Sequence, residues 1–299
     1  MFFQRRHLAA VIGGLLLSCA AYAGKLAIVI DDFGYRPAEE NKVLQMPAAI
    51  SVAVLPDAPG ARQMAIKAHQ GGHEVLIHLP MAPLSKQPLE KDTLTPEMSS
   101  EEIARILRSA VNNVPYAVGL NNHMGSKMTS SLPGMVKVMQ ALNQYNFYFL
   151  DSMTIGNSQS VPAAQGTHVK VLKRRVFLDD SQDIDAIRQQ FTRAVKLAQR
   201  DGYAIAIGHP HPNTVRVLQQ MLPTLPADIT LVRPSQLLNE PLHGGTPPVK
   251  PQPRPQKPGF QPPGVCKVQP QPVPATKALG VVWESVNKGI ISRTFNQLF

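Results

Sequence analysis

The stretch that decides the fold lies near the N-terminus, at residues 25–34, and reads KLAIVIDDFG. Its five apolar residues, 26–30, form an uninterrupted run, and Asp31 and Asp32 follow at once. A short apolar run of this kind is typical of a strand that is buried on both faces in a parallel sheet. The paired carboxylates alone do not define a site, because they also fit a polar loop or a helix cap.

Similar apolar runs recur through residues 25–238 and alternate with longer stretches of helical period. We expect strands at residues 26–30, 50–55, 74–79, 117–120, 147–150, 203–207 and 229–232. We expect helices at residues 38–44, 60–69, 101–112, 133–144, 184–200 and 214–221, the third of them started by a capping box of Ser99 and Glu102. The pattern predicts an α/β fold, either an open sheet or a distorted, incomplete (β/α) barrel of about seven parallel strands.

Composition and charge indicate a folded core and argue against one class of partner. The chain has 299 residues, 43% of them hydrophobic, which is enough for a sizeable core. The formal net charge is +10, yet residues 24–240 carry 21 Lys and Arg against 19 Asp and Glu, and residues 241–299 carry seven against one. This distribution puts the excess at the ends of the chain and not in a stripe on the folded body. Since no helix-turn-helix, finger or RNA-binding signature accompanies it, we expect no nucleic-acid partner.

The N-terminus has the order of a secretory signal. Two basic residues precede the apolar run 8–17, and the small-x-small triplet AYA follows at residues 21–23. We expect cleavage after Ala23, so that the mature chain is periplasmic or secreted and has no integral membrane span. An uncleaved anchor and lipidation at Cys19 are the alternatives. Removal of Cys19 leaves Cys266 without a partner, so no disulfide is expected.

A distinct composition begins after residue 240. Residues 241–275 contain 12 prolines interleaved with Gln and Lys, which predicts an extended, disordered tail that follows a folded domain at residues 24–240. Residues 276–299 regain apolar side chains and fit either a short amphipathic helix or a poorly ordered end. Nothing in the sequence identifies a partner for the tail.

Polar side chains follow several of the predicted strands at the point where each strand ends. Parallel strands bring their C-terminal ends to one edge of a sheet, so these side chains should converge. They are Asp31 and Asp32, His78, Asn121, Asn122 and His123, Asp151, and His209 and His211. One carboxylate and two imidazoles leave open coordination positions on Zn²⁺ or a similar divalent ion, as catalytic sites require. We therefore expect a divalent metal, zinc above all.

Strand alternation narrows the choice of ligands. Glu74 and His78 share one face of the predicted strand 74–79, and His78 stands at its end. His78 is therefore the better ligand, whereas His73 lies outside the run and is expected to pack or cap. Glu74 either orients a ligand imidazole from beneath or belongs to a buried structural ion pair.

Several blocks in order resemble the divergent polysaccharide deacetylase family. They are IDDFG at residues 30–34, GHEVLIHLPM at 72–81, GLNNHMGS at 119–126, LDS at 150–152 and IGHP at 207–210. The resemblance covers about residues 25–240 and implies the distorted (β/α) barrel of the NodB-like polysaccharide deacetylases. Members of that group remove acetyl groups from N-acetylated sugars with a divalent metal.

The resemblance also implies roles for individual residues. It makes Asp31 a catalytic base, Asp32 a metal ligand and His209 a catalytic acid. The better-known deacetylases take both imidazoles from a His-x-x-x-His motif, which this sequence lacks, so we expect His123 to join His78 as the second ligand. Three further residues are assigned to support of the site or to substrate binding, namely Glu74, Asn122 and Asp151.

The function that follows is a polysaccharide deacetylase, a hydrolase of carbon–nitrogen bonds other than peptide bonds, acting on an acetylated, peptidoglycan-like or other cell-envelope glycan. The alternative is a non-catalytic envelope protein that binds a glycan or serves as a scaffold on the same fold. Another kind of metallohydrolase is disfavoured, because the sequence has no third carboxylate cluster and no His-Glu-x-x-His motif.

Overall fold

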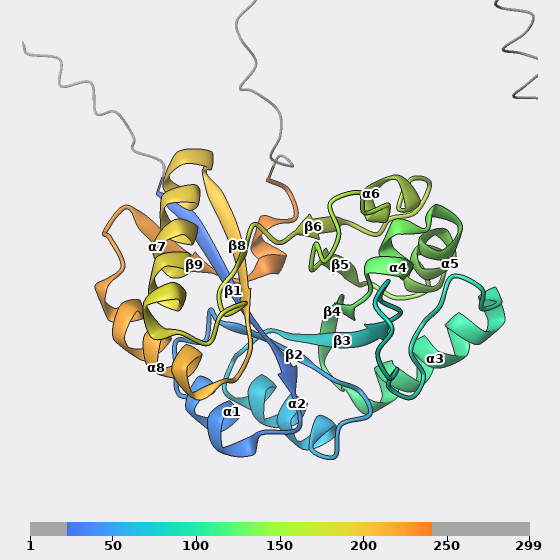
Figure 1. Cartoon of the computed structure of the whole chain (residues 1–299), viewed down its shortest axis with the longest axis horizontal. Helices are drawn as coiled ribbons and strands as arrows, with labels where there is room; N and C mark the ends of the chain where they lie inside the picture. Colours follow the sequence, from blue (N-terminus) through green and yellow to red (C-terminus); the bar gives the residue numbers. More distant parts are fainter. Residues whose placement is uncertain (1–22, 241–299) are drawn as a thin grey trace, which may run out of the picture. The chain divides into compact units, whose positions relative to one another are not determined.

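The computed structural model describes residues 23–240, which fold as alternating strands and helices (Figure 1). The strands of this region are β1 (Gly24–Phe33), β2 (Ser51–Val54), β3 (Val75–Met81), β4 (Ala117–Met124), β5 (Tyr148–Asp151), β6 (Val171–Lys173), β7 (Val176–Phe177), β8 (Tyr203–Gly208) and β9 (Ile229–Val232). The α-helices are α1 (Pro37–Val43), α2 (Ala61–Gln70), α3 (Ser100–Asn113), α4 (Ser126–Ser130), α5 (Leu132–Leu142), α6 (Ser160–Ala163), α7 (Ile184–Asp201) and α8 (Pro212–Met221). Two 3₁₀ turns, η1 (Leu222–Thr224) and η2 (Pro234–Leu237), flank β9.

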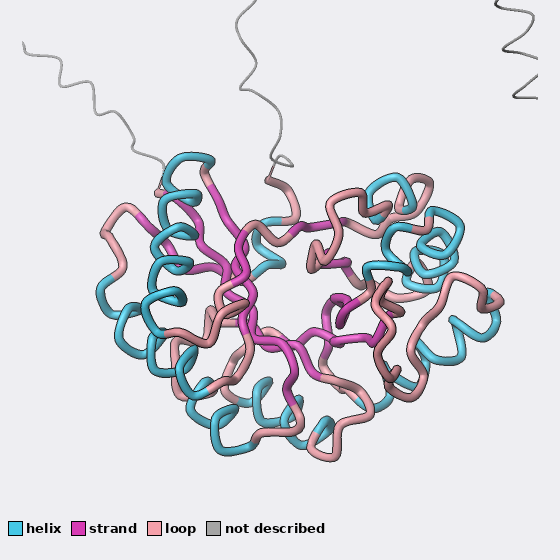
Figure 2. The backbone as a smooth tube through the Cα atoms, viewed as in Figure 1, coloured by secondary structure: helices cyan, strands magenta, loops and turns pink. Residues whose placement is uncertain are grey.

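All strand pairs in this sheet are parallel. The order is β6-β5-β4-β3-β2-β1-β8-β7, and β9 pairs with the first half of β1. The two outermost strands of this order, β6 and β7, are joined along the chain by only Arg174 and Arg175. Because two residues cannot span an open sheet of this width, the sheet curls until its edges nearly meet, as the curved ribbon of strands in Figure 2 shows. The predicted fold class, an incomplete barrel of parallel strands, is confirmed.

Alternation along the strands separates two apolar layers. One face contributes Leu26, Ile28 and Ile30 to the larger cluster, which also contains the buried faces of the helices. The other face contributes Ala27 and Val29 to a smaller cluster made of strand residues and the end of η2. The helices therefore cover the outside of the curved sheet, and the smaller cluster fills its inside.

Every predicted element is present in the structure, which also contains several short elements that were not predicted. All seven predicted strands and six predicted helices are present, and the amide of Glu102 donates a hydrogen bond of 3.1 Å to Ser99 Oγ at the start of α3. The elements that were not predicted are too short to carry a periodic signal, and they are β6 and β7, of three and two residues, α4 and α6, of five and four residues, and the 3₁₀ turns η1 and η2.

The terminal predictions concern residues outside the described range. The signal sequence, the Pro-rich segment 241–275 and the segment 276–299 fall there and stay predictions. Within residues 23–240, no helix is long and apolar enough to cross a membrane.

Candidate metal centre and acid–base groups

The inside of the barrel turns polar at the C-terminal ends of its strands. Nearer the start of each strand, the inner face holds apolar residues such as Val29, Leu76 and Ile207. Two residues after each of these, on the same face, the residue is polar. Strand alternation thus points five polar side chains into the same end of the barrel. They are Asp31 on β1, His78 on β3, Asn121 and His123 on β4, and His209 after β8.

Asp32 reaches this site by a departure from strand geometry. Alternation alone would point it outward, but the pairing of β1 with β2 shifts register between Ile30 and Phe33, as a β-bulge does. Asp32 itself has a left-handed backbone with φ of 57°, a conformation that Asp tolerates better than most residues. The bulge places Asp31 and Asp32 on the two ring nitrogens of one histidine, since Asp31 Oδ2 lies 3.6 Å from His78 Nδ1 and Asp32 Oδ1 lies 3.2 Å from His78 Nε2.

The loop after β1 is held by a buried carboxylate. The backbone amides of Gly34, Tyr35 and Arg36 donate hydrogen bonds of 2.9, 3.0 and 2.6 Å to Glu40 Oε1. Glu40 is fully buried on α1. At Gly34 the φ is +118°, and an added Cβ would lie 2.5 Å from the Cβ of Ala58, so only glycine fits there. The loop that follows the two aspartates is therefore held in one conformation.

Asp32, His78 and His123 form a compact triad. His123 Nδ1 lies 3.1 Å from Asp32 Oδ1 and 3.1 Å from His78 Nε2, and the third side of the triangle is the 3.2 Å contact between Asp32 and His78. Ligand atoms at bonds of about 2.0 Å around a tetrahedral ion lie about 3.3 Å apart. The three atoms thus fit one face of such a tetrahedron.

The triad also leaves one acceptor unsatisfied. Asp32 Oδ1 is buried and accepts no hydrogen bond, although both ring nitrogens lie close to it. Burial favours the neutral carboxyl, but the imidazoles of His123 and His78 hold the pKa of Asp32 well below its usual range. An anionic oxygen beside two imidazole nitrogens is a donor set that suits a zinc-like cation. The residues present therefore fit a divalent metal.

Asn121 fixes the orientation of the His78 ring. Its Nδ2 atom donates a hydrogen bond of 2.8 Å to Asp31 Oδ1, so its Oδ1 atom, 2.8 Å from His78 Nδ1, must accept a hydrogen bond from that nitrogen. Nε2 of His78 then faces the triad, and it carries the lone pair when the ring is neutral. Asn121 was not predicted as a functional residue, although it shares the inner face of β4 with His123.

Asp31 stands beside the triad and is not part of it. It is 2% exposed and hydrogen bonded to Asn121. Burial raises the pKa of Asp31, and the nearby charge of His78 offsets only part of that rise. A carboxylate whose proton affinity is raised beside an open coordination site is suited to accept a proton from a nucleophile.

His209 also lies beside the triad and is paired with Asp179. The Nδ1 atom of His209 lies 3.0 Å from Asp179 Oδ1. Asp179 Oδ2 accepts two hydrogen bonds of 2.7 Å, one from the backbone amide of His209 and one from Thr214 Oγ1. Burial alone would lower the pKa of His209, but the hydrogen bond and charge of Asp179 raise it to about 9. His209 Nε2 lies 3.9 Å from Asp32 Oδ2, so its second N–H faces the site.

A second cluster, Asp179, His209 and His211, also has ligand atoms within 4.8 Å of one another. It is not suited to a cation, because Arg36 Nη1 lies 2.5 Å from His211 Nδ1 and brings its own positive charge. Burial lowers the pKa of His211, which agrees with a neutral ring that accepts from Arg36. His211 thus connects β8 to the loop after β1.

Three predicted residues lie away from the triad. Glu74 shares the inner face with His78 but stands four residues earlier, about 13 Å along the strand. It accepts hydrogen bonds from Tyr148 Oη at 2.7 Å and from the amide of Ser235 at 3.2 Å, so it does not orient His78, and Asn121 has that contact instead.

Asn122 and Asp151 occupy the alternate face of their strands. Asn122 accepts from the amide of Ser152 at 2.9 Å and donates to the carbonyl of Met124 at 2.6 Å. Asp151 is fully buried, and the residues that donate to it are Met153, Ser158 and Ser160. Both residues therefore shape loops beside the site and do not face it.

Comparison with known proteins assigns the chain to a family. The model for divergent polysaccharide deacetylases matches residues 28–238. The chain belongs to the divergent polysaccharide deacetylase family.

Individual relatives agree with this assignment. The chain is 64% identical over 294 residues to the uncharacterized protein YibQ of Escherichia coli (strain K12), an alignment that covers 97% of this chain and 92% of YibQ. An uncharacterized protein of Haemophilus influenzae (strain ATCC 51907 / DSM 11121 / KW20 / Rd) is 45% identical over 208 residues, covering 70% and 74% of the two chains. Among solved structures, the uncharacterized protein ATU2773 of Agrobacterium tumefaciens C58 has the same fold, with a TM-score of 0.67 at 19% identity over 73% of this chain and 90% of that one.

Proposed function

We propose that this protein is an exported, metal-dependent deacetylase that removes N-acetyl groups from a cell-envelope glycan. The observation that supports this most is that two acid–base groups of opposite character lie beside the triad. Asp31 is a buried carboxylate with a raised pKa, and His209 is an imidazole that Asp179 keeps protonated. Family membership gives independent support to deacetylation as the reaction class.

Each residue has a role in amide hydrolysis under this proposal. Asp32, His78 and His123 would hold the ion. When bound, a divalent ion supplies Lewis acidity, which polarises the acetyl carbonyl and makes water a better nucleophile. Asp31 takes the proton that the attacking water loses as its oxygen bonds to the acetyl carbon. His209 donates its Nε2 proton to the sugar nitrogen as the C–N bond breaks, and acetate and a free amine leave.

Export rests on the signal-like N-terminus. β1 begins at Gly24, directly after the predicted cleavage point, so cleavage after Ala23 would leave the first strand whole. Mass spectrometry of the protein taken from its native compartment tests this proposal. A chain that begins at Gly24 supports export, whereas a retained Met1 or a lipid on Cys19 contradicts cleavage.

The test of the activity is metal analysis of the purified protein followed by acetate release from N- and O-acetylated glycans. We expect about one divalent ion per chain and acetate release from at least one N-acetylated glycan, lost on chelation and restored by the metal. If the protein binds metal and glycan but releases no acetate from any substrate, a non-catalytic binding role on the same fold is the better account.

A further inference from the structure

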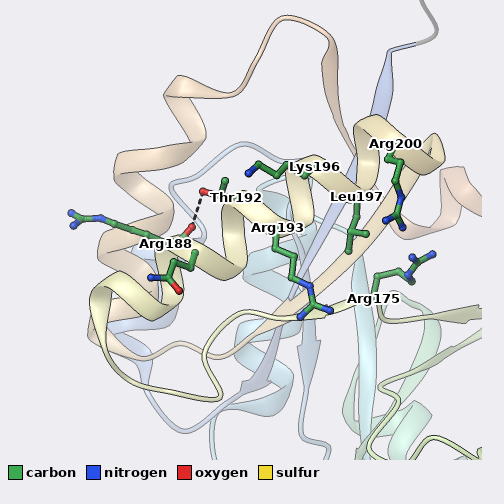
Figure 3. Close-up of a pocket in the computed structure, with 8 residues that line it drawn as sticks. Arg175, Arg188, Thr192, Arg193, Lys196, Leu197 and Arg200 are labelled. Carbon is green, nitrogen blue, oxygen red and sulfur yellow. Dashed lines mark hydrogen bonds between the residues drawn. The ribbon is translucent and has the colours of Figure 1, made fainter.

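A cavity of about 780 Å³ lies along α7 and is rich in cations. Its basic lining residues are Arg175, Arg188, Arg193, Lys196 and Arg200, and no carboxylate lines it. Figure 3 shows Arg193 and Arg200 extending from the helix toward Arg175, while Arg188 points away from them. We call this cavity the α7 groove. The charge distribution along the sequence predicted no basic stripe on the folded body, and the α7 groove shows that this prediction was wrong, because a nearly balanced total charge does not exclude a local concentration of cations.

Two of these cations have no carboxylate partner. Arg175 and Arg200 share Asp201, at 2.9 and 2.6 Å, and Arg188 pairs with Asp185 at 3.0 Å. Arg193 and Lys196 are exposed on α7, and neither has a carboxylate oxygen within ion-pair distance among residues 23–240. The only hydrogen bond of the Arg193 side chain in this region is a long one, 3.4 Å, to Gln190 Oε1. These two side chains are therefore available to an anion.

The lining of the α7 groove is linked to His209 through a neighbouring cavity. A second cavity, of about 550 Å³, also contains Arg175 and Arg193 in its lining and adds Arg174 and Phe177. The Phe177 ring packs against Arg174, whose guanidinium carbon lies 4.8 Å from its centroid, and against His209, with ring centroids 5.2 Å apart. Phe177 thus connects the cationic surface to the proposed acid of the reaction.

We propose that the α7 groove binds carboxylate groups of an anionic glycan strand and guides it to the triad. This inference rests on the proposed function and narrows its substrate from acetylated glycans in general to those with carboxylates along the chain. Guanidinium groups recognise carboxylates well because they donate two parallel hydrogen bonds. A nucleic acid is disfavoured, because the α7 groove contains no aromatic ring on which bases could stack.

The test measures binding of two hexasaccharides by the full mature chain in an Asp31→Asn background, where turnover does not consume the ligand. The hyaluronan hexasaccharide alternates N-acetylglucosamine with a carboxylate sugar, and chitohexaose contains N-acetylglucosamine alone and is neutral. The test variant adds Arg193→Gln and Lys196→Gln. The control variant adds Arg108→Gln on α3 and Arg216→Gln on α8, which remove the same charge from exposed positions outside both cavities.

We expect the test variant to bind hyaluronan hexasaccharide about 5- to 10-fold more weakly, with chitohexaose binding and the control variant unchanged. Binding of the anionic ligand should also weaken as salt rises. Equal losses in test and control variants, unchanged hyaluronan binding, or equally tight binding of a DNA oligonucleotide of the same charge would overturn the inference.

Acetate release is measured separately on wild-type protein with both hexasaccharides. If no acetate appears but the binding pattern holds, the proposed function fails and the α7 groove remains an anionic-glycan site. If acetate is released equally from both ligands and the variants bind like wild type, the proposed function stands and the inference is wrong.

Discussion

His209 and Asp179 form a hydrogen-bonded pair, with 3.0 Å between His209 Nδ1 and Asp179 Oδ1, in which Asp179 is buried and His209 is partly buried. The backbone amide of His209 donates to the same carboxylate. The pairing leaves the Nε2 proton of His209 directed at Asp32. Asp179 therefore both positions the imidazole and keeps it protonated.

Replacement of Asp179 by Asn tests this relation. Because Asp179 raises the pKa of His209 to about 9, activity that needs protonated His209 should fall only as the pH rises through about 9. In Asp179→Asn the basic limb of the pH–rate profile should move down toward the ordinary histidine value of about 6.5, since the largest effect that opposes burial is then lost and only the charges of Asp32 and Asp31 remain. A limb that stays in place would show that His209 is not the acid.

Asn121 offers a test of how the metal ligand is oriented. Asn121→Ala removes the acceptor for His78 Nδ1 and the donor to Asp31. We expect metal affinity to fall by about 10- to 100-fold, as for other residues that orient a ligand histidine. Competition with a chromogenic chelator measures this. Wild-type affinity in a variant with normal thermal unfolding would contradict the assignment.

The inner-face residues show how much of the site could be predicted from the sequence. Apolar runs predicted the strands, and polar residues just after those runs predicted Asp31, His78, His123 and His209 at one edge. Both inferences depend on local periodicity and on the rule that parallel strands end together. They require no knowledge of which strands are neighbours.

Other features depend on contacts that periodicity does not encode. Asp32 reaches the triad only through a bulge, and alternation on its own would direct it outward. Asp179 follows β7, a two-residue strand, and so lacks the apolar run that marked the other strand ends. Glu74 was placed on the correct face beneath His78, but its side chain contacts Tyr148 and Ser235 instead, because a shared face does not imply contact between residues four apart on a strand.

Glu40 provides a prediction about stability. Glu40→Ala leaves the amides of Gly34, Tyr35 and Arg36 without their acceptor, and we expect a loss of about 2–4 kcal/mol in the free energy of unfolding. Glu40→Gln keeps an acceptor oxygen and should lose less. Urea unfolding measures both, with Glu39→Gln, on the first turn of the same helix, as the control. Equal stability of Glu40→Ala and wild type would show that the loop does not depend on this carboxylate.

Metal binding should depend on pH through His78. Burial alone would lower its pKa, but the charge of Asp31 and the contact with Asp32 raise it above the ordinary value of 6.5. The metal must therefore displace a proton from His78, so affinity should increase with pH until the pH exceeds that raised pKa. Isothermal titration with zinc in buffers from about pH 6 to about pH 9 reports both the affinity and the proton released. A zinc affinity that does not change with pH, with no proton released on binding, would contradict the assignment of His78 as a metal ligand.

The measurement that tests the central claim most directly is acetate release by wild type and Asp31→Asn at equal metal content. An amide keeps the shape of the carboxylate but cannot take a proton from water, and loss of a general base costs about 10²- to 10⁴-fold in rate. We predict that Asp31→Asn binds as much metal as wild type and releases acetate at least about 100-fold more slowly. Hydrolysis by Asp31→Asn at the wild-type rate would contradict the account.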